Sequence, residues 1–150
     1  LRGLCQQNKL VDGGFDLLGH RLKLEDIDVP LMAVGCETDH IAPWKDSYRG
    51  VGLMGSADKT FVMTQSGHIA GIVNPPSKGK YGHYTNADVS LDHEGWREGA
   101  TFHEGSWWPR WGAWLENQSD GKVDARIAGE NGRETFGDAP GTYVARRARG

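Results

Sequence analysis

The chain has 150 residues, of which 37% are hydrophobic and 25% charged, and its net charge of −3 argues against a protein that binds nucleic acid or another polyanion. No apolar run approaches the roughly 18 residues that cross a bilayer, and the opening residues lack the charged-then-apolar pattern of a signal segment. Two cysteines at unrelated spacings form no disulfide framework, which is typical of a reducing cytoplasm. We therefore expect a cytoplasmic protein with one core, no transmembrane segment and no nucleic-acid partner.

The first half of the chain predicts a strand–helix–strand unit. Residues 1–26 are punctuated by Gly13-Gly14 and Gly19, so we expect a loop there with at most a short helix. Val29 to Gly35 is almost continuously apolar, as in a parallel strand covered on both faces. Pro43 suits the first turn of a helix that continues to about Met54. The apolar residues 60–63 then predict a second buried strand, parallel to and beside the first.

The second half predicts two helices and much irregular structure. Residues 74–92 are rich in Pro, Gly, Asn and Lys and predict a long surface loop. Asp92 or His93 then opens a helix that carries Trp96 and Ala100. A second helix has Pro109 in its first turn and an aromatic face made by Trp107, Trp108, Trp111, Trp114 and Leu115. We expect this face to pack against the sheet; a surface for a polymer or a partner is the alternative.

An acid and a histidine each follow one of the two predicted strands, 29 residues apart. Asp39 follows the first strand, and His68 follows the second between Gly67 and Gly71. Since the ends of neighbouring parallel strands lie side by side, Asp39 and His68 are expected to touch and to form the acid–base part of a catalytic triad. Taken alone, Asp39 would be read as a turn or cap residue. No Gly-x-Ser-x-Gly type of nucleophile elbow occurs in these 150 residues, with serine or cysteine.

The other titratable side chains are given structural roles. His93-Glu94 and His103-Glu104 lack the helical His-Glu-x-x-His spacing and a third ligand, so the sequence predicts no metal. Cys36 is flanked by acidic residues that disfavour a thiolate, and we expect it to be a small buried hydrophobic residue. The remaining histidines, His20, His40 and His83, are expected in turns or on the surface. His40 is expected to point away from Asp39.

Four motifs stand in order along the chain: Asp39–Trp44 (DHIAPW), Gly67–Pro76 (GHIAGIVNPP), Gly105–Pro109 (GSWWP) and Ala139–Val144 (APGTYV). Together they resemble the polyhydroxyalkanoate synthases of the class I type. The resemblance implies an α/β fold, the C-terminal part of an α/β-hydrolase catalytic domain. Residues 1–116 would belong to that domain, with 1–26 returning from an upstream cap region. Residues 117–150, which are polar and glycine-rich as far as 138, would form a linker and C-terminal tail.

The resemblance also implies a function. The parent protein would be an acyltransferase that polymerises (R)-3-hydroxyacyl-CoA into a polyester and releases CoA, which makes CoA part of the substrate and requires no cofactor. Asp39 and His68 would join a cysteine that is absent from this chain, so the 150 residues alone are expected to be inactive. The acyl pocket is expected to include the residues beside the pair, Ile41, Ile69 and Ala70. A homodimer at cytoplasmic polyester granules, in contact with granule-associated proteins, is further implied.

Two alternatives stay open. Another α/β-hydrolase, such as an esterase or a polyester depolymerase, would use the same acid and base with a serine nucleophile. A non-catalytic interaction module would use the tryptophan face and the tail to bind a granule or a partner subunit. The residue in the nucleophile elbow, cysteine or serine, would distinguish the synthase from the first alternative. A structure in which Asp39 lies far from His68 would favour the second.

Overall fold

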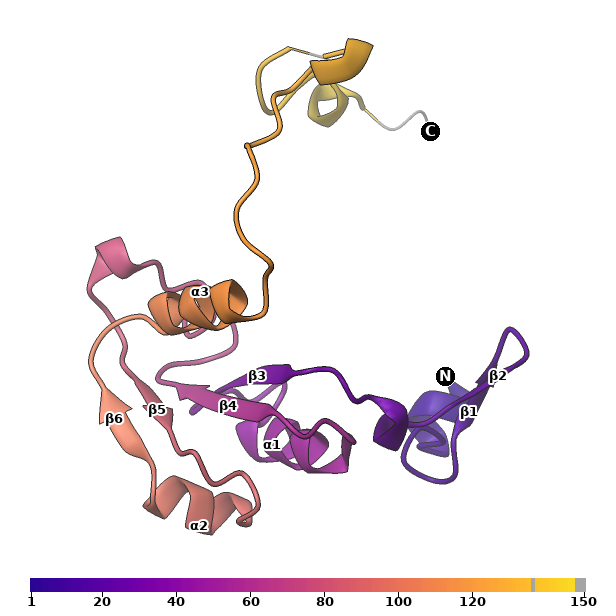
Figure 1. The fold of residues 1–150 in the computed structure, drawn as a ribbon, viewed down its shortest axis with the longest axis vertical. Coiled ribbons are helices and arrows are strands. Elements are labelled where there is room, and N and C mark those ends of the chain that lie inside the picture. Colours follow the sequence, from indigo (N-terminus) through magenta and orange to yellow (C-terminus); the bar gives the residue numbers. More distant parts are fainter. Residues whose placement is uncertain (136, 148–150) are drawn as a thin grey trace. The chain divides into compact units, whose positions relative to one another are not determined.

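The computed structural model describes residues 1–135 and 137–147, and the chain divides into two compact units, residues 1–118 and 119–150. The first unit is a mixed α/β structure around a four-stranded sheet with the order β3-β4-β5-β6 (Figure 1). Strands β3 and β4 run parallel, whereas β4–β5 and β5–β6 are antiparallel. A separate two-stranded hairpin precedes this sheet.

The predicted strand–helix–strand unit is confirmed. Strand β3 (Leu31–Cys36) leads through helix α1 (Trp44–Leu53) to strand β4 (Lys59–Thr64). The two strands are in register from the pair Leu31–Lys59 to the pair Cys36–Thr64, so both end at the same edge of the sheet. Strand β3 begins two residues later than predicted, because Val29 is exposed before the strand enters the sheet.

The core lies between α1, β4 and helix α2 (His93–Glu98). Trp96 of α2 is fully buried, and its ring meets that of Phe61 edge-on at a centroid distance of 5.1 Å. Asp92 caps α2 as predicted, since its side chain accepts a hydrogen bond from the amide of Gly95 at 2.8 Å. Ala100, which was expected on this helix, lies beyond its end. The cap thus starts the short helix that delivers Trp96 to the core.

Two predictions of irregular structure are wrong. The expected loop 74–92 contains a 3-10 turn, Pro76–Lys78, and strand β5 (His83–Thr85), which pairs with β4 and with β6 (Thr101–His103). Strands of three residues have too little periodicity to be read from sequence and form because neighbours supply hydrogen bonds. The expected loop 1–26 holds a π-helix, two strands and a 3-10 turn, which are Arg2–Gln6, β1 (Phe15–Leu17), β2 (His20–Leu22) and Leu24–Asp26.

Helix α3 (Trp108–Asn117) has Pro109 in its first turn, as predicted. Its aromatic face is covered only in part. Trp107, which precedes the helix, is buried, whereas Trp111 and Leu115 are 42% and 40% exposed. The expected packing of this face is therefore only partial, and the described indole hydrogen bonds of Trp107 and Trp108 go to the turn after β4.

The second unit contains two 3-10 turns in its described part, Glu130–Gly132 and Tyr143–Ala145. Residues 136 and 148–150 of the expected tail lie outside the described residues. Across the residues that the structure describes, no helix combines the length and the apolar character of a membrane span.

Candidate functional site: an acid–histidine pair at the ends of two parallel strands

Two turns meet where β3 and β4 end. The amide of Glu37 donates to the carbonyl of Thr64 at 2.8 Å, and the amide of Thr38 donates to the carbonyl of Ser66 at 3.1 Å. These bonds extend the parallel ladder past the strands, so the turn after β3 is tied to the turn after β4. The tie brings the side chains that follow each strand together at one edge of the sheet.

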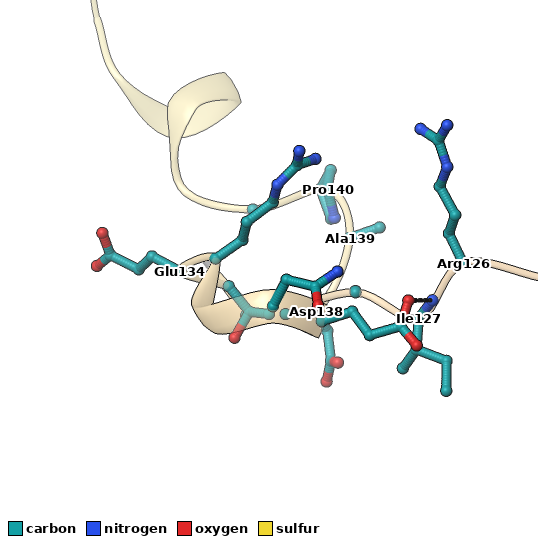
Figure 2. Close-up of a pocket in the computed structure, with 14 residues that line it drawn as sticks. Arg126, Ile127, Glu134, Asp138, Ala139 and Pro140 are labelled. Carbon is teal, nitrogen blue, oxygen red and sulfur yellow. Dashed lines mark hydrogen bonds between the residues drawn. The ribbon is translucent and has the colours of Figure 1, made fainter.

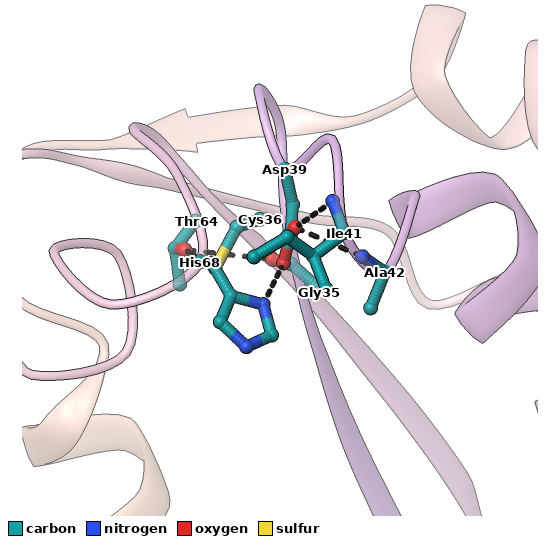
Figure 3. A network of polar contacts seen from close by, with 7 residues as sticks. All are labelled: Gly35, Cys36, Asp39, Ile41, Ala42, Thr64 and His68. Atoms are coloured by element: carbon teal, nitrogen blue, oxygen red, sulfur yellow. Dashed lines mark hydrogen bonds and ion pairs between the residues drawn. The ribbon is translucent and has the colours of Figure 1, made fainter.

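Asp39 and His68 form the contact that the sequence predicts. The Nδ1 of His68 lies 2.7 Å from the Oδ2 of Asp39 (Figure 3). The Asp39 side chain is 5% exposed, whereas that of His68 is 46% exposed. A shielded carboxylate thus binds the Nδ1 edge of the imidazole, and the opposite edge of the ring is open to a reacting molecule.

Backbone amides fix the Asp39 carboxylate on its other side. Its Oδ1 accepts hydrogen bonds from the amides of Ile41 at 2.8 Å and Ala42 at 2.9 Å, just before α1 (Figure 3). The amide of Ala42 is the largest influence that lowers the pKa of Asp39, and His68 and Ile41 add to it against the opposing effect of burial. The carboxylate is therefore ionised at neutral pH and oriented before any ligand arrives.

The orientation of His68 determines what the pair can do. With Nδ1 against the carboxylate, the proton is favoured on Nδ1 and the lone pair on Nε2, which lies on the side of the ring away from Asp39 (Figure 3). Nε2 can then accept a proton as a general base and return it as a general acid, while Asp39 stabilises the imidazolium. The acid and the base of a catalytic triad have this same arrangement.

Two of the three predicted pocket residues share a cavity. Ile69 and Ala70 follow His68 directly and line a hollow of about 330 Å³. Ile41 is 65% exposed and is not among the lining residues of this hollow. Five other described residues line the cavity, two of them lysines: Val73, Asn74, Lys78, Lys80 and Tyr81.

Cys36 has the surroundings of a structural thiol. It is 1% exposed, and its Sγ lies 3.3 Å from the Oγ1 of Thr64. Burial is the main influence that raises its pKa, Asp39 raises it further, and the bond with Thr64 only partly opposes them. The thiol thus stays protonated and shielded at neutral pH, unlike a nucleophilic cysteine. His40 is exposed beside Asp39.

The other histidines do not form a metal site in the described part of the chain, where no group of three or more His, Cys, Asp or Glu side chains converges. His83 stacks on His103 at a centroid distance of 5.1 Å, and its Nδ1 lies 3.0 Å from the carbonyl of Gly105. Burial lowers the pKa of His83. A neutral His83 whose Nδ1 donates to Gly105 serves the packing of β5 on β6.

The second unit has a concavity of its own, of about 810 Å³, formed within residues 126–141 (Figure 2). Its described lining includes arginines and carboxylates, such as Arg126, Glu134 and Asp138, but no histidine or cysteine. The amide of Ile127 donates to a carboxylate oxygen of Glu130 at 3.3 Å, which shows that this loop is held by its own contacts. Acid–base chemistry is therefore better served by Asp39 and His68.

Comparisons with known proteins agree with the motifs. No family model matches the chain. The chain is 41% identical over 150 residues to the poly(3-hydroxyalkanoate) polymerase subunit PhaC of Cupriavidus necator, which is 99% of this chain and 25% of that protein. It is 40% identical to the protein of the same name from Rhizobium etli. That match extends over 147 residues and covers 98% of this chain and 23% of that protein. A poly(3-hydroxyalkanoate) polymerase of Methylorubrum extorquens is 40% identical over 149 residues, 99% of this chain and 24% of that protein.

The resemblance to polyhydroxyalkanoate synthases is therefore confirmed along nearly the whole chain. The chain spans about a quarter of the length of the curated relatives it matches.

The contribution of Trp107 and Trp108 was missed from the sequence. Their indole groups bind the carbonyls of Gly71 and Ile72, three and four residues after the histidine. Spacing along the helix indicated only a shared face. The motif GSWWP, which stands in the same series as the Asp39 and His68 motifs, was the available indication that these side chains lie near the turn that carries His68.

Proposed function

We propose that this chain is part of a polymerase that joins 3-hydroxyacyl groups from CoA thioesters into a polyester, and that Asp39 and His68 are its acid–base pair. The carrying observation is the 2.7 Å contact between these side chains at the ends of two parallel strands. Identity of about 40% to polymerases over nearly all of the chain supports the choice of this reaction over ester hydrolysis. The close contact also argues against a module without catalytic residues.

In this proposal the nucleophile is a cysteine outside these 150 residues, in line with relatives that are about four times as long. A free thiol has a pKa of about 8.5 and is mostly protonated at neutral pH. The Nε2 of His68 would take its proton, and the thiolate would attack the carbonyl carbon of the hydroxyacyl thioester. The carbon–sulfur bond to CoA then breaks, and the imidazolium returns the proton to the departing CoA thiolate. Asp39 would stabilise the imidazolium between the two transfers.

Chain growth needs a second deprotonation. The 3-hydroxyl of one acyl group must attack the thioester of another, and an alcohol is too weakly acidic to do so unaided. The geometry favours His68 as the base, because its Nε2 edge is open whereas both oxygens of Asp39 are engaged and 95% of its side chain is shielded. Asp39 then acts through the imidazole. Ile69 and Ala70, together with Ile41, would line the acyl pocket.

The larger setting follows from the same proposal. Strands β3 and β4 with α1 would be late parallel elements of an α/β-hydrolase sheet, with residues 1–116 in the catalytic domain and 117–150 as its linker and tail. A polymerase that keeps its product attached would work at the surface of cytoplasmic polyester granules, as a homodimer, beside granule-associated proteins. CoA enters as part of the substrate, so the reaction needs no further cofactor.

A chimeric polymerase tests this function. The 150 matching residues of the Cupriavidus necator polymerase would be replaced by this chain, and release of CoA from 3-hydroxybutyryl-CoA would be followed with a thiol reagent. We expect release by the chimera to fall to background in Asp39→Ala and in His68→Ala. His40→Ala is the matched control, because it removes an exposed imidazole beside Asp39. Release that is indifferent to the first two substitutions would refute the proposal, as would turnover by the 150 residues alone.

A further inference from the structure

The turn that carries His68 is held by two tryptophans from a distant part of the chain. The Nε1 of Trp107 donates to the carbonyls of Gly71 at 3.2 Å and Ile72 at 3.3 Å. The Nε1 of Trp108 donates to the same carbonyl of Ile72 at 2.9 Å. Trp107 is only 8% exposed, so its bonds are shielded from water and compete with little else. We call these two side chains the indole anchor.

Gly71 links the anchor to the histidine. Its amide donates to the carbonyl of Gly67 at 3.0 Å, which closes a turn with His68 inside it. A Cβ at Gly71 would lie 2.5 Å from the Oγ1 of Thr64 and 2.7 Å from the Sγ of Cys36. The turn therefore rests directly on the last residues of β3 and β4, while its next carbonyls are bound by the indole anchor. A shift of Gly71 would carry His68 with it.

The backbone matters here because the ring itself is weakly held. The His68 side chain is 46% exposed, and the interaction described for it is the single contact with Asp39. The chain also enters the turn through Ser66 at a φ of +74°, a conformation that a serine rarely adopts and that surrounding contacts must sustain. The position of the imidazole is therefore set by where the turn is fixed, more than by packing around the ring.

We propose that Trp107 and Trp108 are positioning residues for His68. Their indole N–H groups fix the backbone at Gly71 and Ile72, and the turn then presents Nδ1 to the shielded carboxylate of Asp39. The tryptophans act through the turn and touch no reacting atom. Helix α3 thereby contributes to the acid–base pair although it lies about 40 residues further along the chain, at the GSWWP motif.

Nitrogen NMR of the histidine ring tests the placement in the 150-residue chain. Trp107→Phe keeps an aromatic ring but removes the N–H donor. We expect the 15N shifts of His68, which report a proton held on Nδ1, to move toward the mixed tautomers of a free imidazole. Trp114→Phe is the matched control: it removes an indole N–H from helix α3, which directly follows Trp107, and this N–H is buried without a hydrogen-bond partner among the described residues.

The control is expected to leave the His68 shifts unchanged. Unchanged shifts in a folded Trp107→Phe protein would overturn the proposal. If that variant does not fold, Trp108→Phe, at a less buried tryptophan, gives the same readout and the same decision. An unfolded chain would by itself show the mixed tautomers of a free imidazole, so the shifts are compared only between variants that fold. Under that condition the measurement separates positioning from stability.

A kinetic test rests on the proposed function and uses the chimeric polymerase. Trp107→Phe should lower kcat by roughly 10- to 100-fold, as expected when a reacting group is misplaced, with KM unchanged. In an Asp39→Asn background the same substitution should cost much less, because the tryptophan acts through the Asp39–His68 contact. Fully additive losses would contradict the proposal. A chimera indifferent to His68→Ala would refute the function only, and the NMR result would still decide the placement.

Discussion

Replacing Gly71 by alanine is the sharpest test of how the histidine turn is packed. Gly71 does not have a positive φ, so an alanine meets no backbone strain there. The new methyl group would instead lie 2.5 Å from the Oγ1 of Thr64, 2.7 Å from the Sγ of Cys36 and 2.8 Å from the carbonyl oxygen of Gln65. Each of these is well short of the 3.4 Å at which ordinary contact begins, so the turn or the strand ends must move.

The size of the effect follows from what can move. The Gln65 oxygen is backbone, and the amide of the same residue donates to the carbonyl of Gly82 at 2.9 Å, so a shift there disturbs a further hydrogen bond. Overpacking of this kind costs about 1–3 kcal/mol. Restriction of the unfolded chain by alanine returns about 0.4–1 kcal/mol. We therefore expect a net loss of about 1–2 kcal/mol in the free energy of unfolding.

Urea unfolding followed by tryptophan fluorescence measures this loss, since all six tryptophans lie in residues 1–118. Gly52→Ala is the matched control, because Gly52 lies in helix α1 and a Cβ there meets nothing within 4 Å. It should gain about 0.5–1 kcal/mol from helix propensity. A Gly71→Ala protein as stable as Gly52→Ala would refute the argument that the turn rests on the strand ends.

Three further predictions concern single side chains. The pKa of Asp39 is lowered in the folded protein, so its contribution to stability is present above the unfolded value of about 3.9 and is lost as the pH falls through the folded pKa. In urea unfolding between about pH 2 and about pH 6, the free energy of unfolding of Asp39→Asn should therefore fall less steeply below about pH 4 than that of the wild type. A thiol reagent should modify Cys5 in the native chain but Cys36 only after urea is added, and equal labelling rates would contradict the burial of Cys36. Asp92→Ala should lower the free energy of unfolding by about 1 kcal/mol through loss of the α2 cap, with Asp92→Asn close to wild type.

The sequence was sufficient for the part of the fold that positions the acid and the histidine. Strands β3 and β4 are six residues long, β3 is almost wholly apolar and β4 has the apolar centre Phe61–Met63, and Pro43 marks the start of α1, so local pattern and tertiary structure agree. Their parallel pairing then placed Asp39 beside His68 through the ordinary geometry of a strand–helix–strand unit.

The short strands could not be read in the same way. The hairpin β1–β2 turns at Leu18 and Gly19, both with positive φ, and a leucine at such a position is not a turn residue that a sequence announces. Strand β5 contains a histidine, a tyrosine and a threonine, and it forms because β4 and β6 bind it on both sides. The indole anchor was hidden for a similar reason: helical spacing gives the face of a side chain but not the carbonyl that its N–H will meet.

Asp39 shows why a structural and a catalytic reading of one residue need not compete. Its Oδ1 binds the amides of Ile41 and Ala42 and shapes the turn into α1, while its Oδ2 binds His68. The same amides hold the pKa of the carboxyl group down, so the turn keeps the acid in the charged form that an imidazolium requires. A residue that only capped the turn would leave Oδ2 to water. The amides of the turn therefore orient the carboxylate so that its Oδ2 faces His68.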